Sequence, residues 1–278
     1  MRVRTSVVIA SLILSLSAFA ADTKNIVRLE NGKPNLSGVW QVFNRANNSL
    51  VAQNAQAAHA MKAGDLGPVP ADKVLALGAV GSVAASLGVV EGNNIPYTVE
   101  ARKQQQLNRD NWLNEDPEVK CYLPGIPRAT YMPYPFQIFH NEDAVFFAYE
   151  YAGATRDVFL TDPGPAPIDS WMGQSVGTWD GDTFVVTVTG QNDQTWFDRA
   201  GNFHTVDLKV TESFTPTSEH TMNYVAVIED KAIFTEPWTM SMTLYKRVEK
   251  DAQLQQFKCV EFVEELLYGH LRKGAADE

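Results

Sequence analysis

Strand-length runs in which apolar and polar residues alternate occupy most of the chain between residues 136 and 248. Alternation with a period of two predicts β-strands with one buried and one exposed face. The runs are Gly38–Phe43, Phe136–Phe139, Ala144–Tyr151, Ala154–Leu160, Ser175–Trp179, Thr183–Thr189, His204–Phe214, Thr221–Ile228 and Thr239–Val248. The turns Ala152-Gly153 and Asp180-Gly181 suit two-residue hairpins. We expect about eight strands from these runs, which predicts a mainly-β fold, a closed antiparallel barrel.

The first residues carry the pattern of a cleaved signal peptide. Arg2 and Arg4 give a positive start, Val7 to Leu16 is apolar apart from small residues, and Ala18-Phe19-Ala20 suits a cleavage site. No later segment is long and apolar enough to cross a bilayer, so we expect no stable membrane insertion. The sequence therefore predicts a periplasmic or secreted protein.

The segments before and after the predicted strands differ from them in composition, and the chain as a whole divides into three parts. Residues 44–95 are rich in Ala, Gly, Asn and Gln, residues 97–112 suit a helix, and the loop at 114–135 contains prolines that exclude a sheet interior. Apolar residues recur on one face of a C-terminal helix at Phe257, Val260, Val263, Leu267 and Leu271. We expect a signal peptide at 1–20, a region of strand, helix and Pro-rich loop at 21–135 that packs on the barrel, and the barrel core with its C-terminal helix at 136–278.

The 2 cysteines, Cys121 and Cys259, lie far apart in the sequence. In an oxidising compartment they favour a structural disulfide. The alternative is a reactive thiol, but neither cysteine belongs to a CxxC pair.

The meander of strands with a terminal helix resembles the lipocalin-like, or calycin-type, barrels. The stretches DPEVKCYLPGIPR (116–128), DSWMGQSVGTWDGDT (169–183) and NDQTWFDRAGNFH (192–204) resemble a family of uncharacterised secreted bacterial proteins. This resemblance implies an exported protein with such a barrel, and it transfers no catalytic residue.

Strand parity predicts a polar set on the inner face of the barrel. Pairing about Ala152-Gly153 places Tyr149 opposite Arg156 on the apolar face, and in the run from His204 the even positions include Glu212. A buried arginine needs an acceptor, for which Glu212 is a candidate. The set is either a structural ion pair with a buried histidine, or a polar handle that orients a ligand or exchanges protons.

The loop at 192–204 is dense in polar and aromatic residues. As a ligand-binding rim it would use Trp196 and Phe197 for stacking, and Asp193 or Asp198 would orient His204. Its alternative is a plain connection between strands. Trp171 is a further aromatic candidate for contact with a ligand, although such residues are more often core.

Several functions are disfavoured. A net charge of -10 without a basic stripe argues against nucleic-acid binding. The chain lacks a GxSxG elbow, a phosphate loop, a dinucleotide fingerprint and an EF-hand loop. The histidines form no HxH or HExxH pattern, and a zinc site built from His204, His220 and an aspartate is only a minor alternative. We expect no cofactor and no metal.

Three hypotheses follow from these features. The first is an exported binding protein that holds a small hydrophobic or aromatic molecule in the barrel cavity, with Tyr149, Arg156, Trp171, Asp193, Trp196 and Phe197 as contacts. The second is a cofactor-free acid–base enzyme of the isomerase, cyclase or hydratase type, which uses His204, Glu212 and Asp198. The third is an interaction module that docks a protein partner through residues 44–95.

Overall fold

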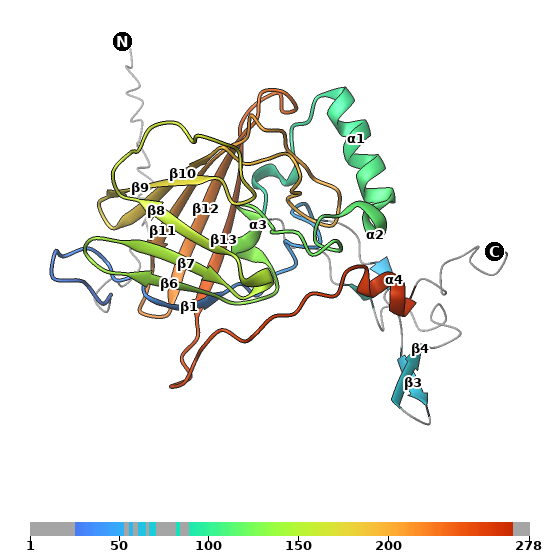
Figure 1. Ribbon diagram of the computed structural model, residues 1–278, viewed down its shortest axis with the longest axis horizontal. Coiled ribbons are helices and arrows are strands. Elements are labelled where there is room, and N and C mark those ends of the chain that lie inside the picture. Colours follow the sequence, from blue (N-terminus) through green and yellow to red (C-terminus); the bar gives the residue numbers. More distant parts are fainter. Residues whose placement is uncertain are drawn as a thin grey trace, which may run out of the picture.

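The computed structural model describes residues 26–52, 56–57, 61–64, 67–70, 82–83 and 89–268. The expected signal peptide at 1–20 and part of the stretch from 44 to 95 lie outside these residues. Within the described residues the fold is mainly β, with a few helices beside a barrel (Figure 1).

A closed barrel forms the body of the molecule, with neighbouring strands in the order β1-β13-β12-β11-β10-β9-β8-β7-β6. The bounds of its strands are β1 Gly38–Gln41, β6 Phe136–His140, β7 Val145–Tyr149, β8 Thr155–Phe159, β9 Gln174–Asp180, β10 Thr183–Thr189, β11 Lys209–Pro216, β12 Thr221–Glu229 and β13 Trp238–Lys246. Outside it, β2 (Gln56–Ala57) pairs with β5 (Ser82–Val83), and β3 (Met61–Gly64) pairs with β4 (Gly67–Pro70).

The barrel is confirmed, but the expected strictly antiparallel arrangement of about eight strands is wrong. Nine strands of the described chain close the barrel, and β8 and β9 run parallel, with Val158 opposite Ser175 and Phe159 opposite Val176. A tight turn reverses the chain, whereas a parallel neighbour needs a longer connection. The segment 160–173, with prolines at 163, 165 and 167, provides that connection.

The hairpin of β7 and β8 differs from the expected one in register but not in its inward face. A 3-10 turn at Tyr151–Gly153 joins the strands, and Arg156 lies opposite Phe147 rather than opposite Tyr149. This shift moves Arg156 by two positions along β7, so its side chain keeps the inward direction.

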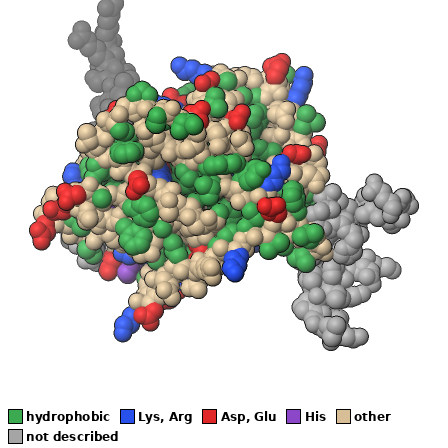
Figure 2. All heavy atoms as spheres, viewed as in Figure 1, with side chains coloured by type: hydrophobic (Ala, Val, Ile, Leu, Met, Phe, Trp, Pro, Cys, Tyr) green, Lys and Arg blue, Asp and Glu red, His purple; other side chains and the backbone are tan. Residues whose placement is uncertain are grey.

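Large side chains fill the inside of the barrel. Phe136, Phe147, Phe184, Phe214 and Tyr224 are fully buried and come from five different strands. Gly177 of β9 makes room for one of them, because a Cβ atom there would lie 2.4 Å from the Cζ atom of Phe184. Figure 2 shows hydrophobic side chains over the middle of one face of the molecule, with Lys and Arg side chains scattered among acidic ones.

The helix expected at 97–112 is present as α1 (Val99–Asp110) and is followed by the short helix α2 (Trp112–Glu115), and both lie beside the barrel (Figure 1). The side chain of Thr98 caps α1 by accepting a hydrogen bond from the N–H of Ala101, as short polar residues do at helix starts. None of the helices in the described part of the chain has the length and apolar character that crossing a membrane requires.

Buried charges hold the short helix α3 (Arg128–Tyr131) in place. Arg128 donates to Asp116 at 2.8 Å, to Glu118 at 2.8 Å and to the side-chain oxygen of Asn47 at 2.8 Å. Arg199 adds two further bonds to Glu118. Burial opposes ionisation of Glu118, but Arg128 and Arg199 overcome this and lower its pKa to about 2.

The chain after β13 forms an arm along the outside of the barrel that leads to α4 (Val263–Tyr268) (Figure 1). The expected C-terminal helix does not yet form at Phe257, and its last apolar residue, Leu271, lies outside the described residues. The expected disulfide between Cys121 and Cys259 is present and ties this arm to the loop before α3. Phe257 packs against the rings of Tyr134 and Tyr151, each at 4.9 Å between ring centroids. The disulfide and this aromatic cluster therefore both hold the arm against the rest of the protein, together with hydrogen bonds such as that from the N–H of Phe262 to the backbone oxygen of Val119.

Candidate functional site

The expected inward polar set contains a fully buried ion pair. Arg156 of β8 donates from Nη2 to Oε2 of Glu212 on β11, and from Nε to the hydroxyl of Ser175 at 2.7 Å. The hydroxyl of Tyr224 donates to the other oxygen of Glu212 at 2.8 Å. Burial on its own would lower the pKa of Arg156, but the carboxylate of Glu212 raises it above the usual value. The raised pKa keeps the guanidinium of Arg156 charged beside the carboxyl group of Glu212.

Tyr149 and Thr130 border this pair. Burial raises the pKa of Tyr149, while the neighbouring guanidinium of Arg156 and hydroxyl of Thr130 act in the opposite direction. Tyr149 comes from β7 and Thr130 from α3, so the helix that lies against the barrel contributes to the polar set.

His204 is buried, but it lies in the loop before β11 rather than on the strand expected to begin there. Its Nδ1 contacts the backbone oxygen of Thr205 at 2.9 Å, and its Nε2 contacts the hydroxyl of Thr195 at 2.6 Å. Because a carbonyl oxygen only accepts, Nδ1 carries the proton of the neutral ring and Nε2 accepts from Thr195. Burial lowers the pKa of His204, which favours this neutral form.

Asp198 does not orient His204, contrary to one of the expected pairings. Its buried carboxylate accepts from the N–H of Leu50 at 2.8 Å and from the backbone and side-chain nitrogens of Asn202 at 3.1 and 2.7 Å. Burial raises the pKa of Asp198 to about 6, although these donors act to lower it. Asp193 is exposed, and it acts on the pKa of His204 only through its charge. The carboxylate of Asp198 thus connects two loops.

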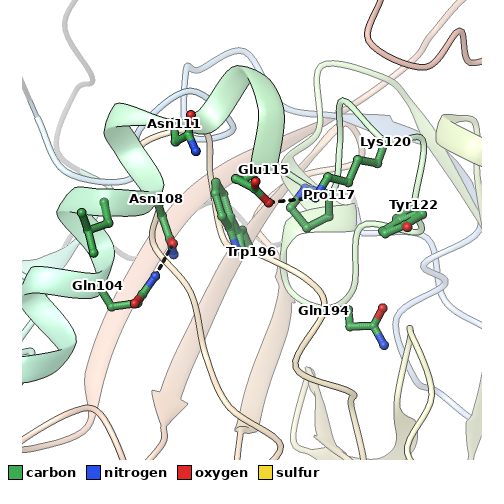
Figure 3. A pocket seen from close by; sticks show the side chains of 10 residues that line it. Gln104, Asn108, Asn111, Glu115, Pro117, Lys120, Tyr122, Gln194 and Trp196 are labelled. Carbon is green, nitrogen blue, oxygen red and sulfur yellow. Dashed lines mark hydrogen bonds and ion pairs between the residues drawn. The ribbon is translucent and has the colours of Figure 1, made fainter.

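A groove of about 540 Å³ lies between the helices α1 and α2 and the loops that follow them (Figure 3). Its lining residues are Gln104, Leu107, Asn108, Asn111, Glu115, Pro117, Lys120, Tyr122, Gln194 and Trp196. The indole of Trp196 stands in the middle of this view, between α1 and the loop that carries Tyr122. Lys120 donates to Glu115 at 3.0 Å, so the two charged residues of the groove neutralise each other.

The aromatic residues that were expected to form one ligand-binding rim lie in different parts of the structure. Trp196 lines the groove, and Trp171 reaches its edge through a ring contact with Tyr122 at 4.8 Å. Phe197 is buried and packs against Trp238 and His204. The inward residues Tyr149 and Arg156 belong to the barrel and not to the groove.

The amide side chains of α1 and of Asn111, the residue just after it, are the part of the groove that sequence reasoning missed. Gln104, Asn108 and Asn111 follow one another at spacings of four and three residues, which places them on one face of a helix. This spacing in the sequence could have predicted a row of amide side chains on one side of the helix. Gln104 donates to Asn108 at 2.8 Å, and both face the groove (Figure 3).

Among the described residues, no group of three or more His, Cys, Asp or Glu side chains could hold a metal ion. Comparison of the chain with family models, with curated proteins and with solved structures finds no match.

Proposed function

We propose that the protein is an exported binding protein and that the groove beside α1 takes a small, uncharged aromatic molecule with polar substituents. The observation that carries this proposal is the lining of the groove, in which the flat indole of Trp196 faces several amide side chains. Pockets that combine aromatic surface with a few hydrogen-bonding groups are typical of small-molecule sites.

The charges of the groove support an uncharged ligand. Glu115 and Lys120 pair with each other, so the charges of the groove offset one another and give no net attraction to an anion or a cation. The amide groups of Gln104, Asn108 and Gln194 each offer both a donor and an acceptor, which suits hydroxyl, carbonyl or amide substituents at the edge of a ring.

The groove is a better location than the barrel interior expected from the sequence. The inward positions of the barrel hold large aromatic side chains that are fully buried against one another. The neutral pair of Arg156 and Glu212 and the neutral His204 also favour binding over the acid–base alternative, because the pair holds no free base and His204 is enclosed by two threonines. Docking of a partner through residues 44–95 stays a hypothesis.

The proposal is tested by titrating the mature protein with 4-hydroxybenzamide, an uncharged aromatic probe, and following intrinsic fluorescence and ligand-detected NMR. Trp196→Ala is expected to weaken binding at least tenfold, as loss of a central aromatic contact costs roughly 2 kcal/mol. The control is Phe43→Ala, since Phe43 is an aromatic residue that is 69% exposed and does not line the groove. Equal affinity of both variants and the unaltered protein would place the site elsewhere.

A further inference from the structure

A cavity of about 180 Å³ lies between the body of the protein and the arm that follows β13. Glu118 and Tyr151 line it from the body, and Phe257, Lys258 and Val263 line it from the arm. None of the residues that line it also lines the groove, so this arm cavity is a separate concave surface. An engineered cavity of about 150 Å³ holds benzene, so the arm cavity has room for one small ring or a short chain.

Aromatic rings form a fixed wall of the arm cavity. The ring of Phe257 lies 4.9 Å from the rings of both Tyr134 and Tyr151, and these two rings lie 5.7 Å apart. The disulfide at Cys259 anchors the arm close to Phe257. Sites for small molecules are typically concave, largely preformed and mostly apolar, and a fixed aromatic wall suits such a site.

The charged side chains of the arm cavity leave one positive charge without a partner. Arg199 donates to Glu118 at 2.8 and 2.9 Å. Deeper in the protein Arg128 donates to Glu118 and Asp116, and the two arginines balance the two carboxylates. Lys258 is exposed, and none of the side chains that the structure describes forms an ion pair with it. Lys258 therefore gives this lining a net positive charge.

This lining selects a ligand with an apolar body and one carboxylate. The aromatic wall accepts the apolar body, while the ammonium group of Lys258 offers three donors for charge-assisted hydrogen bonds to a carboxylate. A cationic ligand gains no acceptor here, because three side chains already donate to the oxygens of Glu118. The preference for an anion distinguishes the arm cavity from the groove.

We propose that the arm cavity is a second binding site, which takes a small aromatic or short aliphatic carboxylate. The apolar body of this ligand rests on the rings of Phe257 and Tyr151, and its carboxylate pairs with Lys258. The site goes beyond the uncharged ligand proposed for the groove, and the two proposals depend on different residues. Both sites can therefore be occupied at the same time.

Titration with benzoate and with benzamide tests the proposal, because the two probes have nearly the same shape and differ in charge. Ligand-detected NMR at low salt follows both. Lys258→Gln is expected to weaken benzoate binding about fivefold and to change benzamide binding by less than about twofold. Lys250→Gln is the control, since Lys250 is an exposed lysine of the same arm that does not line the cavity. It removes the same charge and should leave benzoate binding within about twofold.

Three results of this titration would overturn the proposal. The first is no binding of benzoate up to about 10 mM. The second is an unchanged affinity for benzoate in Lys258→Gln. The third is equal weakening by Lys258→Gln and Lys250→Gln, which would show that benzoate responds only to the net charge of the protein.

A crystal soaked in 4-bromobenzoate locates the ligand directly. The expected result is an anomalous bromine peak beside the rings of Phe257 and Tyr151, with the carboxylate within hydrogen-bond distance of the Nζ atom of Lys258. The absence of a bromine peak from the arm cavity would overturn the proposal. The groove has its own probe and variant, 4-hydroxybenzamide and Trp196→Ala, so failure of one proposal is distinguishable from failure of the other.

Discussion

Removal of one partner from the buried pair of Arg156 and Glu212 should destabilise the barrel far more than removal of both. The two side chains are 1% and 0% exposed, and each has one further side-chain partner, Ser175 for Arg156 and Tyr224 for Glu212. A hydroxyl does not replace a lost opposite charge in a buried position. We therefore expect Glu212→Leu and Arg156→Met each to lower the free energy of unfolding by about 3–5 kcal/mol.

The double variant with both substitutions leaves no buried charge and keeps apolar side chains of similar size, so it should cost only about 0–2 kcal/mol. The two single changes are then strongly non-additive, with a coupling of about 4 kcal/mol or more. Urea unfolding followed by tryptophan fluorescence at pH 7 measures all four proteins. The same cycle on Lys209 and Glu229, an exposed pair at 2.8 Å, serves as the control and should give a coupling below about 1 kcal/mol. Additive losses at Arg156 and Glu212 would refute the reasoning.

Two further predictions concern stability. The disulfide joins residues 138 positions apart and restricts the unfolded chain. The Cys121→Ser, Cys259→Ser double variant should therefore lose up to about 5 kcal/mol of unfolding free energy, measured by urea unfolding. An unchanged urea midpoint would show that the disulfide does not stabilise the protein in this way. Burial raises the pKa of Asp198 to about 6 in the folded protein, above its usual value, so protonation of this carboxyl group stabilises the protein below about pH 4 and the stabilisation is lost as the pH rises through 6. Relative to Asp198→Asn, the unaltered protein should lose about 2 kcal/mol of stability between pH 4 and pH 7. A constant difference between the two proteins would show that Asp198 does not titrate in this range.

Much of the barrel follows from the alternation of side chains along its strands. The inward positions of Arg156 and Glu212 were predictable because side-chain direction has a period of two, and the actual register of β7 and β8 differs from the expected one by two residues. The same pattern carries no information on strand direction, since a strand alternates equally when it runs parallel to its neighbour. The parallel contact of β8 and β9 was therefore missed.

The candidate site was less predictable than the barrel. His204 lies outside the strand that was expected to begin there. Next to it, Asp230 accepts hydrogen bonds from the N–H and the hydroxyl of Thr205, at 2.7 and 3.0 Å, and these bonds turn the backbone before β11. Such a contact joins residues far apart in the sequence and leaves no local signal. The amides of α1 resemble the exposed face of any helix, and only the approach of the loop with Trp196 turns that face into a groove.

The disulfide has a topological consequence for the barrel. The covalent loop that it closes contains every barrel strand from β6 to β13, whereas β1 lies outside the loop and fills the position between β6 and β13. β1 can therefore leave the barrel without any covalent bond being broken, and its departure exposes the hydrogen-bonding edges of two strands. β1 is thus held in the barrel by noncovalent contacts alone, whereas the strands from β6 to β13 belong to one covalent loop.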